Sequence, residues 1–256
     1  MNLQEIISDN AIKKILKDFK SSAEKIKPEI QLTKNVLASY IDHTLLKPDA
    51  TGEEVKNLCA EALQYNFASV CINSSHTSYC FDILKVSNIK VCTVIGFPLG
   101  AMLTSVKCFE AEEALIAGAE EIDMVINVGK LKEGDYDYVF NEIRKIILIA
   151  KKNLSLCKVI LETCLLTDEE KIRACLICKI AGVDFVKTST GFSKSGATLH
   201  DVALMKYIVG DSVKVKASGG IRSIEDAQAM IAAGANRLGT SSGVKIMQAL
   251  ISNSEY

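Results

Sequence analysis

The sequence predicts an α/β protein, a closed (β/α)8 TIM barrel with a helical extension at its N-terminus. From about residue 38 onward, eight short apolar runs alternate with eight segments of helical periodicity, which is the element count of such a barrel. The apolar runs are continuous, as expected of parallel strands that are covered on both faces. A doubly wound open sheet is the alternative, but no nucleotide-binding glycine motif follows the first run.

The predicted strands and helices alternate regularly along the chain. Capping residues begin several helices, for example Thr51 with Glu54 three residues later, and glycine ends several others, for example Gly182. The predicted strands span residues 39–42, 68–72, 90–95, 121–126, 158–161, 184–187, 213–216 and 237–238. The predicted helices span residues 53–64, 78–87, 105–117, 136–151, 168–180, 199–208, 224–233 and 243–251.

Residues 1–36 stand outside this repeat as an N-terminal helical extension, and residues 37–256 form the predicted barrel domain. Helical periodicity with many lysines covers residues 4–26. We expect this helix to have a structural role, either at the bottom of the barrel or in contact with a partner. The chain has three prolines and no linker rich in glycine and serine, so nothing divides the predicted barrel.

Composition excludes several classes of function. The 30 basic residues nearly balance the 31 acidic ones and the chain has no tryptophan, which argues against a nucleic-acid surface. No apolar stretch approaches the roughly 18 residues of a membrane span, and the N-terminus lacks a signal-peptide pattern. We therefore expect a cytoplasmic protein whose partner is a small molecule, with no binding of nucleic acid or membrane.

The nine cysteines are scattered, and most lie within apolar runs. We interpret them as small buried hydrophobic residues in a reducing compartment. Cys175 and Cys178 form a C-x-x-C pattern within a predicted helix, but a second pair of ligands is missing, so a zinc or redox role is the less favoured alternative. No two histidines have the spacing of metal ligands, and we expect no catalytic metal.

Lys187 and Lys216 are the most informative residues of the chain. Each ends an apolar run that is predicted to be a buried strand, and each is followed at once by small residues and glycine. A buried amine must be paired or lose its proton, and two amines in one pocket favour deprotonation of one of them. A neutral lysine amine attacks carbonyl groups to form imines, whereas a free lysine is a cation at pH 7.

Other polar side chains are expected at the same end of the barrel, where barrel enzymes carry their active sites. Asp123 lies within an apolar run and is predicted to pair with the lysines, either structurally or as an acid in proton transfer. Asp42 is interpreted either as a structural partner of a lysine or a backbone amide, or as a substrate-binding residue, and His43 is expected to be a neutral, hydrogen-bonded histidine at the rim. Thr44, Cys71 and Thr190 complete the candidate substrate-binding residues.

Glycine turns follow the last three predicted strands and indicate a phosphate site. Barrel phosphate sites are usually formed by the loops after strands seven and eight, where glycine lets the backbone approach the anion. Ordinary turn chemistry is the alternative interpretation. The candidate phosphate-binding residues are Gly191, Gly219, Gly220, Gly239, Ser241 and Ser242.

Five segments in order resemble the deoxyribose-phosphate aldolase family. They are residues 42–47 (DHTLLK), 121–127 (EIDMVIN), 185–192 (FVKTSTGF), 215–222 (VKASGGIR) and 239–243 (GTSSG). The resemblance extends from about residue 37 to the C-terminus, and the long N-terminal lead is where the chain departs from compact family members.

The resemblance implies an activity. The family consists of class I (Schiff-base) aldolases on a (β/α)8 barrel, which are metal-independent aldehyde-lyases. They reversibly cleave 2-deoxy-D-ribose 5-phosphate to acetaldehyde and D-glyceraldehyde 3-phosphate in deoxyribonucleoside catabolism. No cofactor is implied beyond a covalent imine on the enzyme, and homo-oligomers, dimers or tetramers, are expected.

The resemblance also implies residue roles. Lys187 matches the Schiff-base lysine, Lys216 the second lysine that perturbs it, and Asp123 the acid of proton transfer. Asp42 and Thr44 match residues near the substrate hydroxyls, and the glycine turns with their serine pair match the phosphate site. The alternatives are another phosphate-binding barrel, either a different Schiff-base aldolase or an isomerase, and a barrel that has lost its activity. Borohydride trapping with acetaldehyde discriminates among them.

Overall fold

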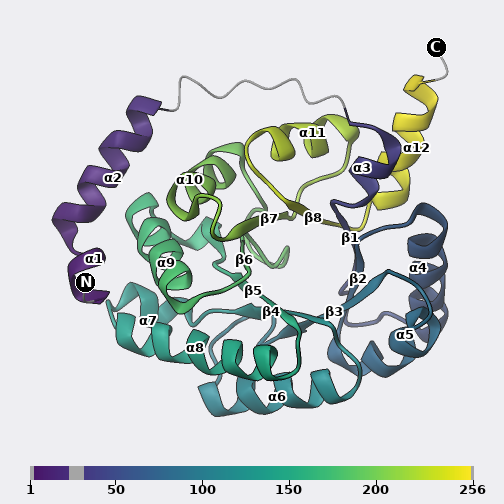
Figure 1. The fold of residues 1–256 in the computed structure, drawn as a ribbon, viewed down its shortest axis with the longest axis horizontal. Helices are drawn as coiled ribbons and strands as arrows, with labels where there is room; N and C mark the ends of the chain where they lie inside the picture. The colour runs from purple at the N-terminus through teal and green to yellow at the C-terminus, as the bar shows by residue number, and fades with distance from the viewer. Residues whose placement is uncertain (1–2, 23–31, 255–256) are drawn as a thin grey trace.

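A computed structural model describes residues 3–22 and 32–254. Its strands are all parallel and close into a barrel in sequence order, with the last strand paired to the first, which confirms the predicted fold class (Figure 1). The strands are β1 (Ile41–Leu45), β2 (Ser69–Ile72), β3 (Lys90–Ile95), β4 (Glu121–Val125), β5 (Leu156–Ile160), β6 (Phe185–Lys187), β7 (Lys214–Ser218) and β8 (Arg237–Thr240).

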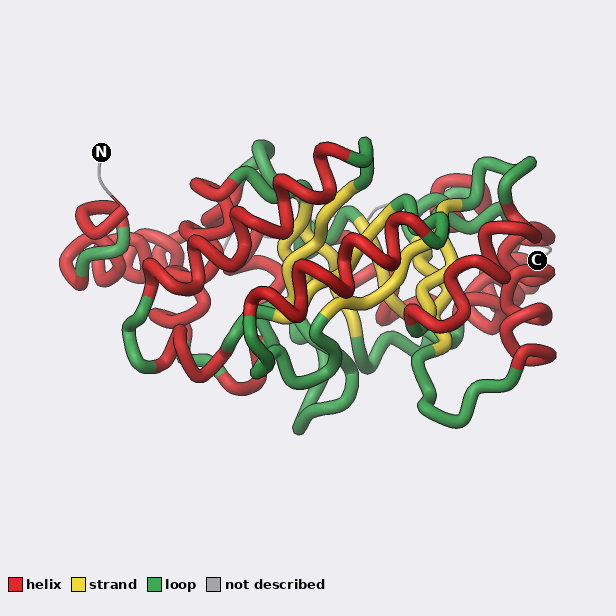
Figure 2. The backbone as a smooth tube through the Cα atoms, turned by 90° about the horizontal axis from the view of Figure 1, so that it is seen from below, coloured by secondary structure: helices red, strands yellow, loops and turns green. Residues whose placement is uncertain are grey.

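Helices surround this barrel. Figure 2 shows the strands at the centre of the molecule with helices on either side. Thr51 and Glu54 form the predicted capping box, and Gly182 ends its helix in the left-handed conformation with φ of 81°. The helices that follow the strands are α4 (Gly52–Tyr65), α5 (Thr77–Leu84), α6 (Thr104–Ile116), α7 (Val128–Lys132), α8 (Tyr136–Lys152), α9 (Asp168–Ala181), α10 (Leu199–Val209), α11 (Ile224–Ala232) and α12 (Gly243–Ser254).

Some elements differ from the predicted ones. The helix α7 and the 3-10 helices η2 (Ser74–His76) and η3 (Thr163–Leu165) were not predicted, because such short turns show no periodicity. The first strand begins at Ile41, two residues later than predicted, and it continues to Leu45. As a result Asp42 lies inside the barrel instead of at the end of a strand.

The N-terminal extension packs on the outside of the barrel. It contains α1 (Leu3–Ile6), α2 (Asp9–Ser22) and α3 (Lys34–Ala38), which leads into β1. In Figure 1, α2 lies beyond α9 and α10, and the rings of Phe19 and Tyr207 are 5.5 Å apart between centroids. Arg173 of α9 donates a hydrogen bond to the carbonyl of Ile7 and forms an ion pair with Asp9.

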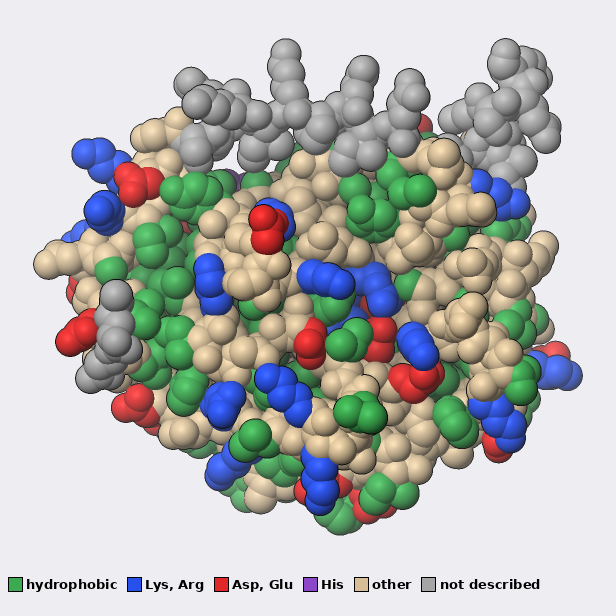
Figure 3. Space-filling view, viewed as in Figure 1, with side chains coloured by type: hydrophobic (Ala, Val, Ile, Leu, Met, Phe, Trp, Pro, Cys, Tyr) green, Lys and Arg blue, Asp and Glu red, His purple; other side chains and the backbone are tan. Residues whose placement is uncertain are grey.

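The described part of the extension thus contacts the outer helices, and residues 23–26 of the predicted helix lie outside the described residues. The boundary between residues 36 and 37 stays a prediction. Among the described helices, none combines the length and the apolar character that a membrane span requires. On the face shown in Figure 3, basic and acidic side chains are intermixed.

The hydrophobic core lies between the barrel and its helices. Side chains alternate along each strand, so Ile122 and Met124 of β4 are buried in that core while Asp123 between them points into the barrel. The barrel interior is therefore available for polar groups.

Candidate active site

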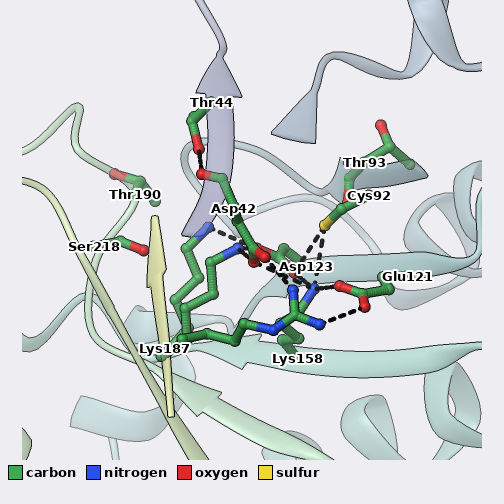
Figure 4. A network of polar contacts seen from close by, with 12 residues as sticks. Asp42, Thr44, Cys92, Thr93, Glu121, Asp123, Lys158, Lys187, Thr190 and Ser218 are labelled. Carbon is green, nitrogen blue, oxygen red and sulfur yellow. Dashed lines mark hydrogen bonds and ion pairs between the residues drawn. The ribbon is translucent and has the colours of Figure 1, made fainter. Parts of the chain in front are cut away.

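Charged side chains from six strands meet inside the barrel, and we call them the charge network (Figure 4). Six of the seven side chains are at most 3% exposed, and Arg237 at one end is 14% exposed. The members are Asp42 of β1, Glu121 and Asp123 of β4, Lys158 of β5, Lys187 of β6, Lys216 of β7 and Arg237 of β8.

The strand register brings these residues together. Asp123 lies opposite Lys158 across the pair of β4 and β5, and Lys187 lies opposite Lys216 across β6 and β7. Side chains at paired positions of neighbouring parallel strands point to the same side of the sheet. For these four residues that side is the barrel interior, where the three lysines meet at Asp123.

Asp123 is at the centre of the network. Its Oδ2 accepts hydrogen bonds from Lys187 Nζ at 2.8 Å and Lys216 Nζ at 2.7 Å, and its Oδ1 accepts one from Lys158 Nζ at 2.9 Å. Burial raises the pKa of this carboxyl, but the charges of Lys158, Lys187 and Lys216 hold the pKa well below its usual range. Asp123 is therefore a carboxylate that organises three amines.

Lys216 is held as a cation. Its Nζ lies 2.5 Å from Asp42 Oδ2 as well as 2.7 Å from Asp123 Oδ2. Burial lowers the pKa of Lys216, but the carboxylates of Asp123 and Asp42 outweigh it and raise the pKa above its ordinary value. Lys216 thus places a positive charge beside Lys187, which lies on the same carboxylate oxygen.

The other two cations also contact more than one carboxylate. Lys158 Nζ lies 2.6 Å from Glu121 Oε2 in addition to its contact with Asp123. Arg237 forms an ion pair with Asp42 and another with Glu121, the latter at 2.9 Å. Within the charge network, by contrast, Lys187 contacts Asp123 alone. Lys187 is therefore the network amine with the fewest carboxylate contacts.

His43 points away from the barrel interior. Its Nε2 lies 2.6 Å from Glu61 Oε2, and its ring packs on Phe67. Burial lowers the pKa of this histidine against the opposing effect of Glu61, which agrees with the expected neutral, hydrogen-bonded imidazole. His43 does not reach the reacting groups.

A pocket of about 280 Å³ opens above Lys187, which is one of its lining residues and is only 2% exposed. Thr44 and Thr190 line the same pocket. The side chains of Asp42, Asp123 and Lys216 are fully buried beneath it. Lys187 is therefore the network amine that a bound molecule reaches from the pocket.

Cys71 does not line this pocket, although it was predicted to bind substrate. It is fully buried on β2 beside Cys92 of β3, its partner in the strand register. Together with Leu46, Val94 and Phe97 these thiols form a small apolar wall on one side of the barrel interior. Cys71 thus contributes to the surroundings of the network.

The glycine turns also line the pocket. All six candidate phosphate-binding residues line it. Gly219 and Gly220 both have φ of +83°, a conformation that residues with a side chain rarely adopt. Ser242 immediately precedes α12 and its carbonyl accepts the amide of Ile246, so the serine pair lies at a helix start.

Two exposed cations, Lys47 and Arg222, also line the pocket and were not predicted as site residues. Both occur in segments that carry the family resemblance, which is the signal that could have identified them. Their charges lie beside the glycine turns, where an anion would be bound.

Glu162 was also missed. This buried residue has φ of 55°, a strained conformation for a residue with a side chain, and its carboxylate accepts hydrogen bonds from the amide and hydroxyl of Thr190. It therefore anchors the loop that follows Lys187. The adjacent pair of polar residues at the end of the predicted strand, Glu162 and Thr163, was the available signal.

Two groups of side chains among the described residues have the composition of a metal site. Cys71, Cys92 and Asp123 have potential ligand atoms within 4.8 Å of one another, but the oxygens of Asp123 already accept from three amines. Asp168 and Asp201, grouped with His200 on the outside, are both paired with Lys171.

Cys175 and Cys178, the C-x-x-C pair, are fully buried in α9. Burial raises the pKa of both thiols. A buried, protonated thiol is a poor metal ligand and a poor nucleophile. This geometry favours the interpretation of these cysteines as core residues.

Comparisons with known proteins agree on one family. The model of the DeoC/LacD family aldolases matches residues 36–249. The deoxyribose-phosphate aldolase of Clostridium perfringens is 54% identical over 225 residues, which cover 88% of this chain and all of that protein. The enzyme of the same name from Caldanaerobacter subterraneus is 58% identical over 213 residues, which cover 83% of this chain and 92% of that protein.

A solved structure shares the fold. The deoxyribose phosphate aldolase of Aeropyrum pernix, described as tetrameric, superposes with a TM-score of 0.81 at 36% identity. The match covers 94% of this chain and 98% of that chain.

Proposed function

The chain belongs to the DeoC/LacD family of aldolases, and we propose from this premise that its charge network performs Schiff-base cleavage of 2-deoxy-D-ribose 5-phosphate. The products are acetaldehyde and D-glyceraldehyde 3-phosphate, and the reaction is reversible. The observation that carries the proposal is the position of Lys187, a buried amine in the lining of a pocket that is also lined by the glycine turns. A sugar that spans the pocket places its aldehyde at the amine and its phosphate at the turns.

Lys187 is the nucleophile in this mechanism. Its neutral Nζ attacks the aldehyde carbon C1 of the open-chain sugar, and loss of water gives a protonated imine. The neighbouring ammonium of Lys216 favours the neutral form of Lys187, since a like charge disfavours protonation. Asp123, which contacts both amines, relays protons between them during formation and breakdown of the carbinolamine.

The protonated imine then acts as the electron sink. A base, Asp123 acting through water, removes the proton of the C3 hydroxyl, and the C3 carbonyl forms as the bond between C2 and C3 breaks. The electron pair of that bond moves toward the imine nitrogen, so an enamine of acetaldehyde remains on Lys187. Protonation at C2 and hydrolysis of the imine release acetaldehyde and restore the amine.

The phosphate is bound at the rim of the pocket. Gly191, Gly219 and Gly220 offer backbone amides, Ser241 and Ser242 offer hydroxyl groups, and Lys47 and Arg222 supply charge. Contacts this far from the reacting carbon orient the substrate. We propose that Thr44 and Thr190, which line the same pocket as Lys187, face the sugar hydroxyls.

The mechanism uses no cofactor beyond the covalent imine on Lys187 and no metal. The tetrameric relative suggests that this chain also forms a homo-oligomer. Exposed apolar residues on α6, including Phe109 at 64% and Ile116 at 78% exposure, offer a surface for that contact. Light scattering on the purified chain measures its mass in solution, and the cytoplasmic location stays a prediction.

One assay tests the function. We expect release of glyceraldehyde 3-phosphate from deoxyribose 5-phosphate in the presence of EDTA, and covalent trapping of acetaldehyde by borohydride. Lys187→Leu should abolish trapping and lower kcat by about 10⁴-fold or more, because no other network amine reaches the pocket. Normal trapping in this variant would show that the nucleophile has been assigned to the wrong residue.

A further inference from the structure

The charge network extends well beyond the reacting groups. Arg237 and Glu121 are the first residues of β8 and β4, whereas Lys187 is the last residue of β6. Because the strands are parallel, Arg237 and Glu121 lie toward the end of the barrel opposite the pocket. Neither residue lines the pocket.

These two residues are connected to Lys187 through a continuous set of ion pairs. Arg237 contacts Asp42, Asp42 contacts Lys216, and Lys216 shares Asp123 with Lys187. Glu121 is connected through Lys158, which also contacts Asp123. A change of charge at the bottom of the barrel is therefore transmitted through a medium with little water.

The number of charges is balanced in one protonation state. Asp42, Glu121 and Asp123 supply three negative charges, and Lys158, Lys216 and Arg237 supply three positive ones. Each of these cations contacts at least two carboxylates. With Lys187 neutral, the network has no net charge. With Lys187 protonated, it carries one uncompensated positive charge in a buried site, which is unfavourable.

We propose that Arg237 and Glu121 are positioning residues that set the pH range in which Lys187 is a neutral nucleophile, by balancing the network charge without touching the substrate. This inference rests on the proposed function. It assigns to the bottom of the barrel a role in the chemistry that takes place at the top.

The remaining titratable groups that face the network are few. Cys71 and Cys92 face it from β2 and β3, and Lys214 of β7 is solvent-exposed near Phe185. Burial and the hydrogen bond with Cys71 raise the pKa of the Cys92 thiol, which keeps it neutral. The hydrogen bond from Cys92 and the charge of Lys216 lower the pKa of Cys71 to about 7 despite its burial. The test therefore includes a background in which Cys71 is replaced.

The sign of each effect follows from the charge removed. Loss of the positive charge in Arg237→Met makes the network more negative and favours protonated Lys187, so imine formation requires a higher pH. Loss of the negative charge in Glu121→Gln has the opposite effect. The double variant removes one charge of each sign, so the net charge of the network is the same as in the wild type.

The experiment measures trapping of acetaldehyde by borohydride as a function of pH, with the modified full-length chain quantified by mass spectrometry. We expect the midpoint of trapping to rise by about one pH unit in Arg237→Met and to fall by about one unit in Glu121→Gln, a tenfold change in neutral amine. The double variant and Arg237→Lys should lie near the wild type. The same signs should hold in a Cys71→Ala background.

Midpoints equal to that of the wild type, shifts of the same sign, or loss of the signs in the Cys71→Ala background would overturn the proposal. If Arg237→Met does not fold, Glu121→Gln and Arg237→Lys still test the proposal, because Glu121→Gln should lower the trapping midpoint and Arg237→Lys should leave it unchanged. Absence of trapping in the wild type at every pH would overturn the proposed function as well. Normal trapping in the wild type, with the same midpoint in every variant, would overturn the proposed role of Arg237 and Glu121 and leave the proposed function intact.

Discussion

The floor and the rim of the pocket are built in opposite ways. The floor consists of Lys187 with Asp123 and Lys216 behind it, and its charged groups are buried and fixed by ion pairs. The rim consists of the glycine turns and the serine pair, and much of it is exposed backbone. Buried ions fix protonation and geometry, and removal of one partner is costly. A backbone rim binds through main-chain groups, so its side chains are less critical.

The largest effect that separates the two regions is expected from Lys216→Leu. Loss of the ammonium removes the like charge beside Lys187, so Lys187 holds its proton to a higher pH and imine formation slows near neutrality. We expect kcat to fall by about 10³-fold, or about 4 kcal/mol, with the pH optimum moved upward. Steady-state kinetics between pH 6 and 10 measure both changes, and an unchanged pH profile would contradict the role of Lys216.

At the floor of the pocket, Asp42→Asn should lower the stability of the folded protein. The variant leaves Lys216 and Arg237 short of a buried carboxylate, and we expect the free energy of unfolding in urea to fall by about 3 kcal/mol at pH 7. Burial raises the pKa of Asp42, but the charges of Lys216 and Arg237 outweigh burial and hold the pKa below its usual range.

The pH dependence of that difference has a definite sign. A carboxyl whose pKa is lowered in the folded state stabilises the fold fully above its unfolded pKa of about 3.9 and loses this contribution below it. The difference between wild type and Asp42→Asn should thus be constant down to about pH 4 and narrow at lower pH. A difference that narrows already between pH 7 and 5 would point to another group.

The smallest effect is expected at the rim. In a variant with Ser241→Ala and Ser242→Ala, only hydroxyl donors are lost and the backbone amides remain. We expect KM for deoxyribose 5-phosphate to rise about tenfold, which corresponds to a loss of about 1.4 kcal/mol of binding free energy, with kcat nearly unchanged. Deoxyribose without phosphate is the control substrate, and an equal rise in its KM would argue against phosphate binding at the serines.

The sequence was sufficient to predict the order of elements and the two lysines at the ends of strands. Lys187, Lys216 and Asp123 stand out because a charge within an apolar run must be paired. The glycine turns after the last three strands are also visible, since glycine marks positions where the backbone needs special conformations or close approach.

Other parts of the site depend on closure of the barrel. Lys158 and Arg237 are the first residues of the strands predicted from the sequence, where a charge normally indicates an exposed flank. The strand register brings both into the barrel interior. The register also pairs Cys71 with Cys92, and neither residue lines the pocket. The conformation of Glu162 was not predictable, because no local pattern requires φ of 55° at a glutamate.

Gly239 connects the floor with the rim. A methyl group at this position would overlap Ser218 Oγ and lie 3.1 Å from Lys216 Cε, so β8 presents bare main chain to the reaction chamber. Because Gly239 has no side chain to remove, a substitution at this position cannot widen the pocket on the side of β8. Its size is adjustable only where replaceable side chains such as Leu46 and Phe192 line the opening, and acceptance of bulkier aldehydes would have to evolve, or be engineered, from those positions.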